Sequence, residues 1–199
     1  STLASHGMLL IPIGPDGGST PMGVITTATS NFEEMSKLAR KQGLTLAQTA
    51  AKLKGQEVIS LPTAPNPVGN YRPYKISGKL VYINQIALDQ GKVKHPGIIG
   101  KNVTMEEAKE ATRQTTLNVL AVLKSAVNGD LSKVKQAVQI TGYFNTAPDF
   151  KDHSLLLNES SDLLIKVLGE RGIHARAAMG APSLPMESPT EIQAIFELK

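Results

Sequence analysis

The C-terminal residues 174–199 read HARAAMGAPSLPMESPTEIQAIFELK and predict two β-strands that decide the fold. Residues 174–181 are small and apolar around a single guanidinium, that of Arg176. From Glu191 onward apolar and polar side chains alternate, which is typical of a strand with one buried face, and Glu191 falls on the other face. Prolines between the two runs interrupt pairing, because proline donates no ladder hydrogen bond. We therefore predict a hairpin with a long, stiff connection that makes Arg176 and Glu191 cross-strand neighbours.

Two interpretations of these charges follow. A guanidinium in a mostly apolar run needs a partner, and a cross-strand ion pair with Glu191 would supply one. Alternatively, Arg176 binds the carboxylate of a small ligand through two parallel hydrogen bonds. Glu191 would then orient or deprotonate a water. This second arrangement suits hydrolysis of a small acid that carries an electrophilic C=N bond.

The upstream sequence predicts the rest of one domain. Strands are expected at 74–77, 80–86 and 134–146, and helices at 104–128 and 153–168, from their periodicity, capping residues and terminating glycines. With the two C-terminal strands this gives a β-β-α-β-α-β-β order. Such an order indicates an α+β fold, a mixed sheet covered on one face by two helices.

The first 59 residues are expected to form an N-terminal extension with short helices, followed by the main domain at 60–199. Ser30-Asn31-Phe32-Glu33 has the pattern of a capping box, and residues 45–54 are a second helical candidate. Residues 61–70 contain three prolines and a glycine, which predicts a linker. A packing appendage is the preferred role of the extension, and a functional lid is the alternative.

The sheet face opposite the helices is predicted to need a cover. Val81, Ile83, Val138 and Ile140 are assigned to that face, where they would form an apolar patch that a monomer would not tolerate. Self-association would bury it.

Several short motifs, in this order, resemble the YjgF/RidA (reactive intermediate deaminase) family, also known as the L-PSP endoribonuclease family. The resemblance spans residues 60–199 and rests on the order and spacing of the motifs. The matching stretches are Pro67–Tyr71, Leu80–Ile86, Gly91-Lys92, Ala111–Gln114, Asn118-Val119, Val134–Phe144, Asp149-Phe150, Asn158, His174–Arg176, Leu184-Pro185 and Glu191–Phe196. Ala147–Phe150 and Gly169–Arg176 resemble the longer branch of the family.

The resemblance implies a chorismate-mutase-like fold that closes as a homotrimer with sites between subunits. It implies hydrolytic deamination of reactive 2-imino or enamine acids, such as 2-aminoacrylate, to 2-oxo acids and ammonia. Arg176 would hold the substrate carboxylate and Glu191 would be the catalytic, water-positioning residue. Tyr71 and Asn158 match the remaining pocket positions; packing on the core and a helix-surface amide are their respective alternatives.

Asn84 is a further substrate-binding candidate, at a place where this chain departs from the family. The family often has Ser-Gly-Gln where this chain has Ile83-Asn84-Gln85, and Ser and Cys where it has Ala177-Ala178. The pocket is therefore expected to be smaller or differently polar. Imine hydrolysis would then be slow, shifted to another acid, or lost.

Two other functions compete with the deaminase. The first is a non-catalytic trimer that binds a small carboxylate or another protein. RNA cleavage ranks last, because the sequence shows no pair of histidines for acid–base chemistry and, with four Phe, four Tyr and no Trp, few side chains for base stacking. We therefore expect a small carboxylate as the ligand and do not expect a nucleic acid.

Composition sets further limits. A net charge of +4 spread along the chain permits anionic ligands without favouring nucleic acid. The absence of cysteine excludes disulfides and thiolate chemistry, and the four histidines are not spaced as metal ligands, so we expect no metal and no cofactor. No apolar window is long enough for a membrane helix. Residues 1–7 look like a remnant before a native start at Met8, with a degraded organelle presequence as the alternative, so a cytoplasmic location is expected and a mitochondrial one is second.

Overall fold

The computed structural model describes residues 8–9, 36–37, 39–41, 43, 49 and 59–199. The chain divides into two compact units, Ser1–Ser60 and Leu61–Lys199. In the first unit, β1 (Met8–Leu9) pairs antiparallel with β2 (Ile59–Ser60), and residues 36–37, 39–41 and 49 are helical. The capping box predicted at Ser30–Glu33 and nearly all of the predicted helix at 45–54 lie outside the described residues.

The second unit has the predicted β-β-α-β-α-β-β order, and the α+β fold class is confirmed. Its main elements are β3 (Tyr74–Ser77), β4 (Leu80–Ile86), α3 (Met105–Ala126), β7 (Val134–Asn145), α4 (His153–Leu168), β8 (Ala175–Ala181) and β9 (Thr190–Leu198). A small hairpin of β5 (Leu88–Asp89) and β6 (Lys92–Val93) was not predicted, because two-residue strands are too short to show periodicity. Short 3-10 turns occupy Leu131–Lys133, Gly169–Gly172 and Pro185–Glu187.

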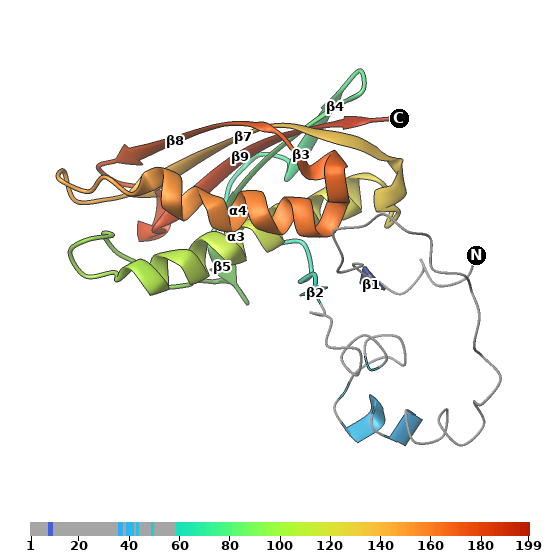
Figure 1. The fold of residues 1–199 in the computed structure, drawn as a ribbon, viewed down its shortest axis with the longest axis horizontal. Helices are drawn as coiled ribbons and strands as arrows, with labels where there is room; N and C mark the ends of the chain where they lie inside the picture. Colours follow the sequence, from blue (N-terminus) through green and yellow to red (C-terminus); the bar gives the residue numbers. More distant parts are fainter. Residues whose placement is uncertain (1–7, 10–35, 38, 42, 44–48, 50–58) are drawn as a thin grey trace. The chain divides into compact units, whose positions relative to one another are not determined.

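Both long helices cover the same face of the five-stranded sheet, whose strand order is β3-β4-β9-β7-β8 (Figure 1). Ile192, Ala194 and Phe196 of β9 are buried on this side, which we call the helix face. The intervening side chains, including Glu191, point to the other side, which we call the open face, because successive strand residues alternate. The two faces therefore differ in which candidate residues they carry.

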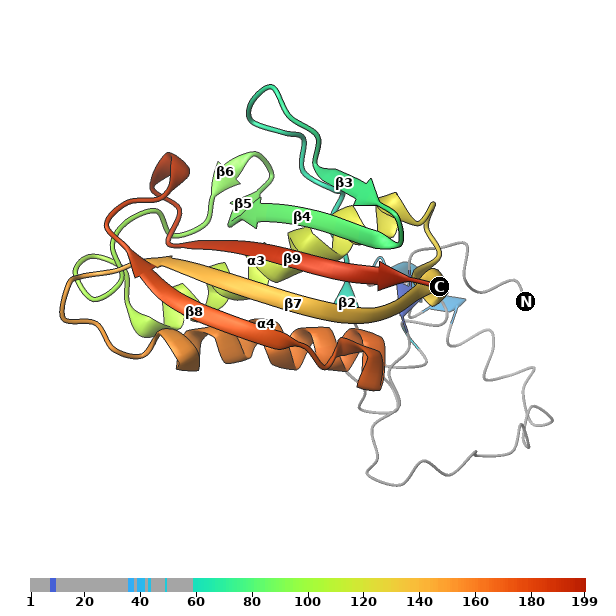
Figure 2. The same cartoon turned by 90° about the horizontal axis from the view of Figure 1, so that it is seen from above.

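The predicted C-terminal hairpin is wrong. β8 pairs in parallel with β7 at the sheet edge, whereas β9 pairs with β4 on one side and β7 on the other (Figure 2). Parallel neighbours need a long crossover, and α4 supplies it between β7 and β8. The proline-containing connection after β8 then returns the chain across β7, so Arg176 and Glu191 are separated by a whole strand.

The predicted apolar patch is also wrong. Val81, Ile83 and Ile140 lie on the helix face with exposed fractions of 0%, 4% and 0%, and only Val138 is partly exposed, at 36%. Val81 and Ile83 do share one face of β4, as the alternation of strand residues requires, but that face is the one the helices cover. The open face instead mixes Tyr82 and Met179 with polar side chains, so it gives no simple hydrophobic argument for self-association.

Local contacts determine where α3 begins and how closely α4 packs on the sheet. The capping box at the start of α3 is formed: the Thr104 hydroxyl accepts from Glu107 N, and the Glu107 carboxylate accepts from Thr104 N at 2.8 Å. The hydrogen bond from the Thr104 backbone holds the pKa of Glu107 below its usual range. Over β7, a Cβ at Gly142 would lie 2.7 Å from Leu157 of α4, so glycine permits the close approach of this helix to the sheet.

Candidate functional site

A cavity of about 200 Å³ contains three of the predicted site residues, Tyr71, Asn84 and Glu191. Asn84 of β4 and Glu191 of β9 lie on the open face of adjacent strands, since Asn84 is paired with Gln193 and Ile86 with Glu191. The Asn84 amide nitrogen donates to Glu191 Oε1 at 2.6 Å. This contact orients the carboxylate and leaves Oε2 without a hydrogen-bond partner among the described residues, so Oε2 can accept from a water.

Tyr71 forms a wall of this cavity. It lies in the segment just before β3, its side chain is 54% exposed, and its hydroxyl oxygen accepts from Val68 N at 3.4 Å. Tyr71 is therefore neither part of a strand nor packed on the core, in contrast to the alternative interpretation.

Arg176 lies on the helix face, against α4. Its Nη1 donates to Ser161 Oγ at 3.0 Å, and its Nη2 donates to Ser154 Oγ at 3.0 Å and to the Ser154 carbonyl at 3.4 Å. None of the carboxylates in the described part of the chain forms an ion pair with this guanidinium. The predicted alternative of a cross-strand ion pair with Glu191 is therefore wrong within one chain.

The register gives the separation of the two charged residues. Arg176 is level with Ile140 and hence with Ala194, three residues from Glu191 and two strands away. At ~3.3 Å per residue and ~4.8 Å per strand, the two Cα positions are about 14 Å apart, and their side chains leave opposite faces of the sheet. One small molecule cannot contact both in a single chain.

Asn158 belongs with Arg176 and not with Glu191. It is exposed on α4, four residues after Ser154 and three before Ser161, and these spacings put all three on one side of the helix. The five predicted residues thus form two groups. Tyr71, Asn84 and Glu191 form the open-face group, and Arg176 and Asn158 form the α4 group.

Two cations near the open-face group were missed from the sequence. Arg72 and Lys75 line a neighbouring hollow of about 420 Å³ that shares Tyr71 and Asn84 with the smaller cavity. Arg72 directly follows Tyr71, so its place in the family-like segment was a signal that could have been used. It is a competing carboxylate-binding residue within the same chain.

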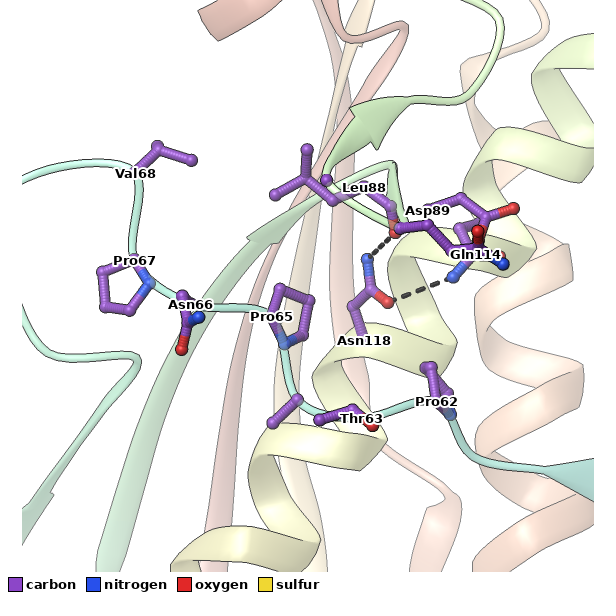
Figure 3. Close-up of a pocket in the computed structure, with 13 residues that line it drawn as sticks. Pro62, Thr63, Pro65, Asn66, Pro67, Val68, Leu88, Asp89, Gln114 and Asn118 are labelled. Atoms are coloured by element: carbon purple, nitrogen blue, oxygen red, sulfur yellow. Dashed lines mark hydrogen bonds between the residues drawn. The ribbon is translucent and has the colours of Figure 1, made fainter.

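The largest of the described cavities, about 660 Å³, lies between the Pro62–Val68 segment, the β5–β6 hairpin and α3 (Figure 3). At its base the fully buried Asn118 donates to the carbonyls of Ile86 and Leu88 and accepts from Gln114 Nε2. No Lys, Arg or His is among its lining residues, and Asp89 adds a negative charge. It therefore does not suit a small acid. Asn118 instead holds the backbone of Ile86 and Leu88, two residues that line the Glu191 cavity.

The described residues contain neither a metal-ligand cluster nor a membrane-spanning helix. No group of three or more His, Cys, Asp or Glu side chains there could hold a metal ion. Likewise, no helix in the described part combines the length and apolar character that crossing a bilayer requires.

Known proteins match most of this chain. Residues 49–198 match the family described as "YjgF/chorismate mutase-like, putative endoribonuclease". Protein TCP17 of Trypanosoma cruzi is 34% identical over 142 residues, which cover 70% of this chain and 88% of TCP17.

Several solved structures are also similar to this chain. The protein Atu1372 of Agrobacterium tumefaciens, of unknown function, is 36% identical with a TM-score of 0.68, covering 85% of this chain and 98% of Atu1372. A putative endoribonuclease from Shewanella oneidensis is 34% identical with a TM-score of 0.67, covering 76% of this chain and 98% of its own. Escherichia coli TdcF, solved with bound serine, is 18% identical with a TM-score of 0.51, over 72% of this chain and 100% of TdcF, and shows the shared fold alone.

Proposed function

This chain belongs to the YjgF/chorismate mutase-like family, and we propose that it hydrolyses small 2-imino acids to 2-oxo acids and ammonia. The observation that carries the proposal is the Glu191 carboxylate, oriented by Asn84 inside a cavity of about 200 Å³, with one oxygen left to bind water. A cavity of that size can hold a small molecule but not a protein or a folded RNA.

In the proposed reaction, Glu191 orients a water for attack on the imine carbon. The C=N bond becomes a single bond as the C–O bond forms, and a proton passes from the water to nitrogen through the carboxylate. The hydroxyl proton of the resulting carbinolamine then moves to the amine nitrogen, the C–N bond breaks, and ammonia leaves as the C=O bond of the 2-oxo acid forms. The substrate carboxylate, next to the reacting carbon, needs a cation to hold it in place.

We assign that cation to Arg176 of a second copy of the chain. The carboxylate and the imine carbon are directly bonded and only one water lies between that carbon and Glu191, so the guanidinium and the Glu191 carboxylate must lie within about 10 Å of each other. One chain cannot achieve this, because the two side chains leave opposite faces of the sheet from Cα positions about 14 Å apart. Arg176 lies on β8, an edge strand, and is exposed, so a neighbouring copy can reach it.

The contact would join the α4 group of one copy to the open-face group of the next. These are different surfaces, so the contact is heterologous, and repeating it closes a ring of subunits. A homotrimer, with three such sites, is the ring we propose.

A trapping assay tests the function. An amino acid oxidase generates 2-imino acids from alanine or leucine, and semicarbazide traps the imine as an absorbing semicarbazone. We expect the purified protein to lower the semicarbazone signal while 2-oxo acid and ammonia accumulate faster. A rate equal to the enzyme-free background, with binding of 2-oxobutyrate intact, would instead favour the carboxylate-binding trimer without chemistry.

Asn84 is expected to restrict the size of the substrate side chain. Asn84→Ala removes an amide from the cavity wall, and we expect the ratio of kcat/KM for the leucine-derived imine to that for the alanine-derived imine to rise about tenfold, the value of one or two methylenes in a pocket. The same change should lower kcat on the small imine, because Glu191 loses its orienting hydrogen bond.

Gln136→Ala is the matched control for Asn84→Ala. Its amide nitrogen also donates to a β9 carboxylate, Glu197 Oε2 at 2.7 Å, but it lies away from the cavity. Its substrate ratio should equal that of the wild type. An unchanged ratio in Asn84→Ala would show that Asn84 does not limit the pocket.

A further inference from the structure

We infer that Ser161 and His174 are positioning residues that hold the Arg176 guanidinium in its binding orientation. This inference rests on the proposed role of Arg176. Four groups form a continuous hydrogen-bonded series: the Gly172 carbonyl, the His174 ring, the Ser161 hydroxyl and the Arg176 guanidinium. The links through Ser161 were not apparent from sequence spacing, because Ser161 lies in the middle of α4 and the other three residues lie beyond its end.

The direction of each bond follows from the chemistry of the groups. The Gly172 carbonyl can only accept, so His174 Nδ1, at 2.6 Å, carries the proton. In the neutral ring Nε2 is then an acceptor, and the Ser161 hydroxyl, at 3.1 Å, donates to it. With its proton committed to His174, Ser161 Oγ presents lone pairs to Arg176 Nη1 at 3.0 Å.

This series selects one orientation for an otherwise mobile side chain. Arg176 is exposed and long, so its guanidinium would sample several rotamers without partners, and ordering such a side chain costs conformational entropy. A serine without a fixed acceptor could turn its proton toward the guanidinium, but His174 prevents this. Bonds that run in one direction also polarise each other, which strengthens the Ser161 contact with the cation.

Ser154 contacts the other terminal nitrogen of the same guanidinium but is not part of the hydrogen-bonded series that contains His174 and Ser161. It accepts from Nη2 through both its hydroxyl and its carbonyl, and its backbone contact survives removal of the side chain. The chain therefore offers two serines on one helix that contact one guanidinium, of which only Ser161 is coupled to a histidine. Ser161→Ala and His174→Gln therefore disrupt the coupled contact while both Ser154 groups that accept from Arg176 remain.

The test measures the Kd of 2-oxobutyrate by calorimetry for Ser161→Ala, His174→Gln and the double variant. Each single variant is expected to weaken binding about five- to tenfold, the value of one ordinary hydrogen bond, and the double variant no further. Ser161→Thr, which keeps the hydroxyl, should restore the wild-type Kd. Thermal unfolding of each variant checks that the fold is retained.

Controls separate this inference from the function it rests on. Ser125→Ala removes an exposed serine from α3, away from Arg176, and should leave the Kd unchanged. If Arg176→Ala abolishes binding while Ser161→Ala and His174→Gln bind normally, the positioning role is refuted and the proposed function stands. If Arg176→Ala also binds normally, both the positioning role and the proposed function are refuted.

A different outcome would also overturn the positioning role. A hydroxyl that donates to an imidazole has the polarity of a serine nucleophile pair. Labelling of Ser161 by a fluorophosphonate probe, lost in His174→Gln, would show that Ser161 acts directly on a substrate rather than through Arg176.

Discussion

Replacing Arg176 by alanine is expected to lower kcat/KM for 2-imino acids about 100-fold, because a charge-assisted, two-point hydrogen bond to the substrate carboxylate is lost. The loss should appear mainly as a higher KM, since the guanidinium binds a group that does not change during the reaction. Binding of 2-oxobutyrate should fall by a similar factor. Trapping kinetics over a range of substrate concentrations, together with calorimetry, measure both quantities.

Arg72→Ala is the control that makes this result specific. Arg72 lines the hollow next to Glu191 in the same chain, so it is the alternative residue for holding the carboxylate. We expect Arg72→Ala to change kcat/KM less than threefold. The reverse result, with Arg72→Ala inactive and Arg176→Ala active, would move the site into a single chain and remove the need for a second copy.

Glu191→Gln is expected to lower kcat at least about 100-fold, which is the usual contribution of a general base. KM and the Kd of 2-oxobutyrate should stay within about threefold of the wild type, because the amide oxygen of glutamine can still accept from Asn84 and the cavity keeps its shape. The separation of kcat from binding distinguishes this residue from Arg176.

The control for Glu191→Gln is Glu197→Gln, on the same strand. Glu197 accepts from Lys135 at 2.9 Å and from Gln136, and the Lys135 hydrogen bond holds its pKa below the usual range. It lies outside the cavity, and its substitution should leave kcat unchanged. If Glu191→Gln turned over substrate at the wild-type rate, water activation by Glu191 would be excluded.

Elements with strong local signals could be predicted from the sequence. The strands Tyr74–Ser77 and Leu80–Ile86 and the helix His153–Leu168 are found at their predicted bounds, because a turn glycine, a run of β-branched residues or a terminating glycine marks each end. The order of elements followed from these signals, and the family resemblance supplied the fold.

Strand pairing could not be predicted in the same way. Whether β9 pairs with β8 or inserts between β4 and β7 depends on contacts far apart in the sequence, and both arrangements bury the same apolar residues of β9. The face on which Arg176 lies follows from that pairing. The sequence therefore identified the two charged residues of the candidate site but not that they belong to opposite faces.

Complementation between Arg176→Ala and Glu191→Gln chains tests the central claim most directly. Each variant alone lacks one half of every site and should be nearly inactive. Co-expressed chains that assemble at random should recover about one quarter of wild-type activity, because a site is intact only where Arg176 of one copy meets Glu191 of the next. The purified assembly should have the mass of a trimer by light scattering. Activity that stays at the level of the separate variants would contradict a site shared between two copies.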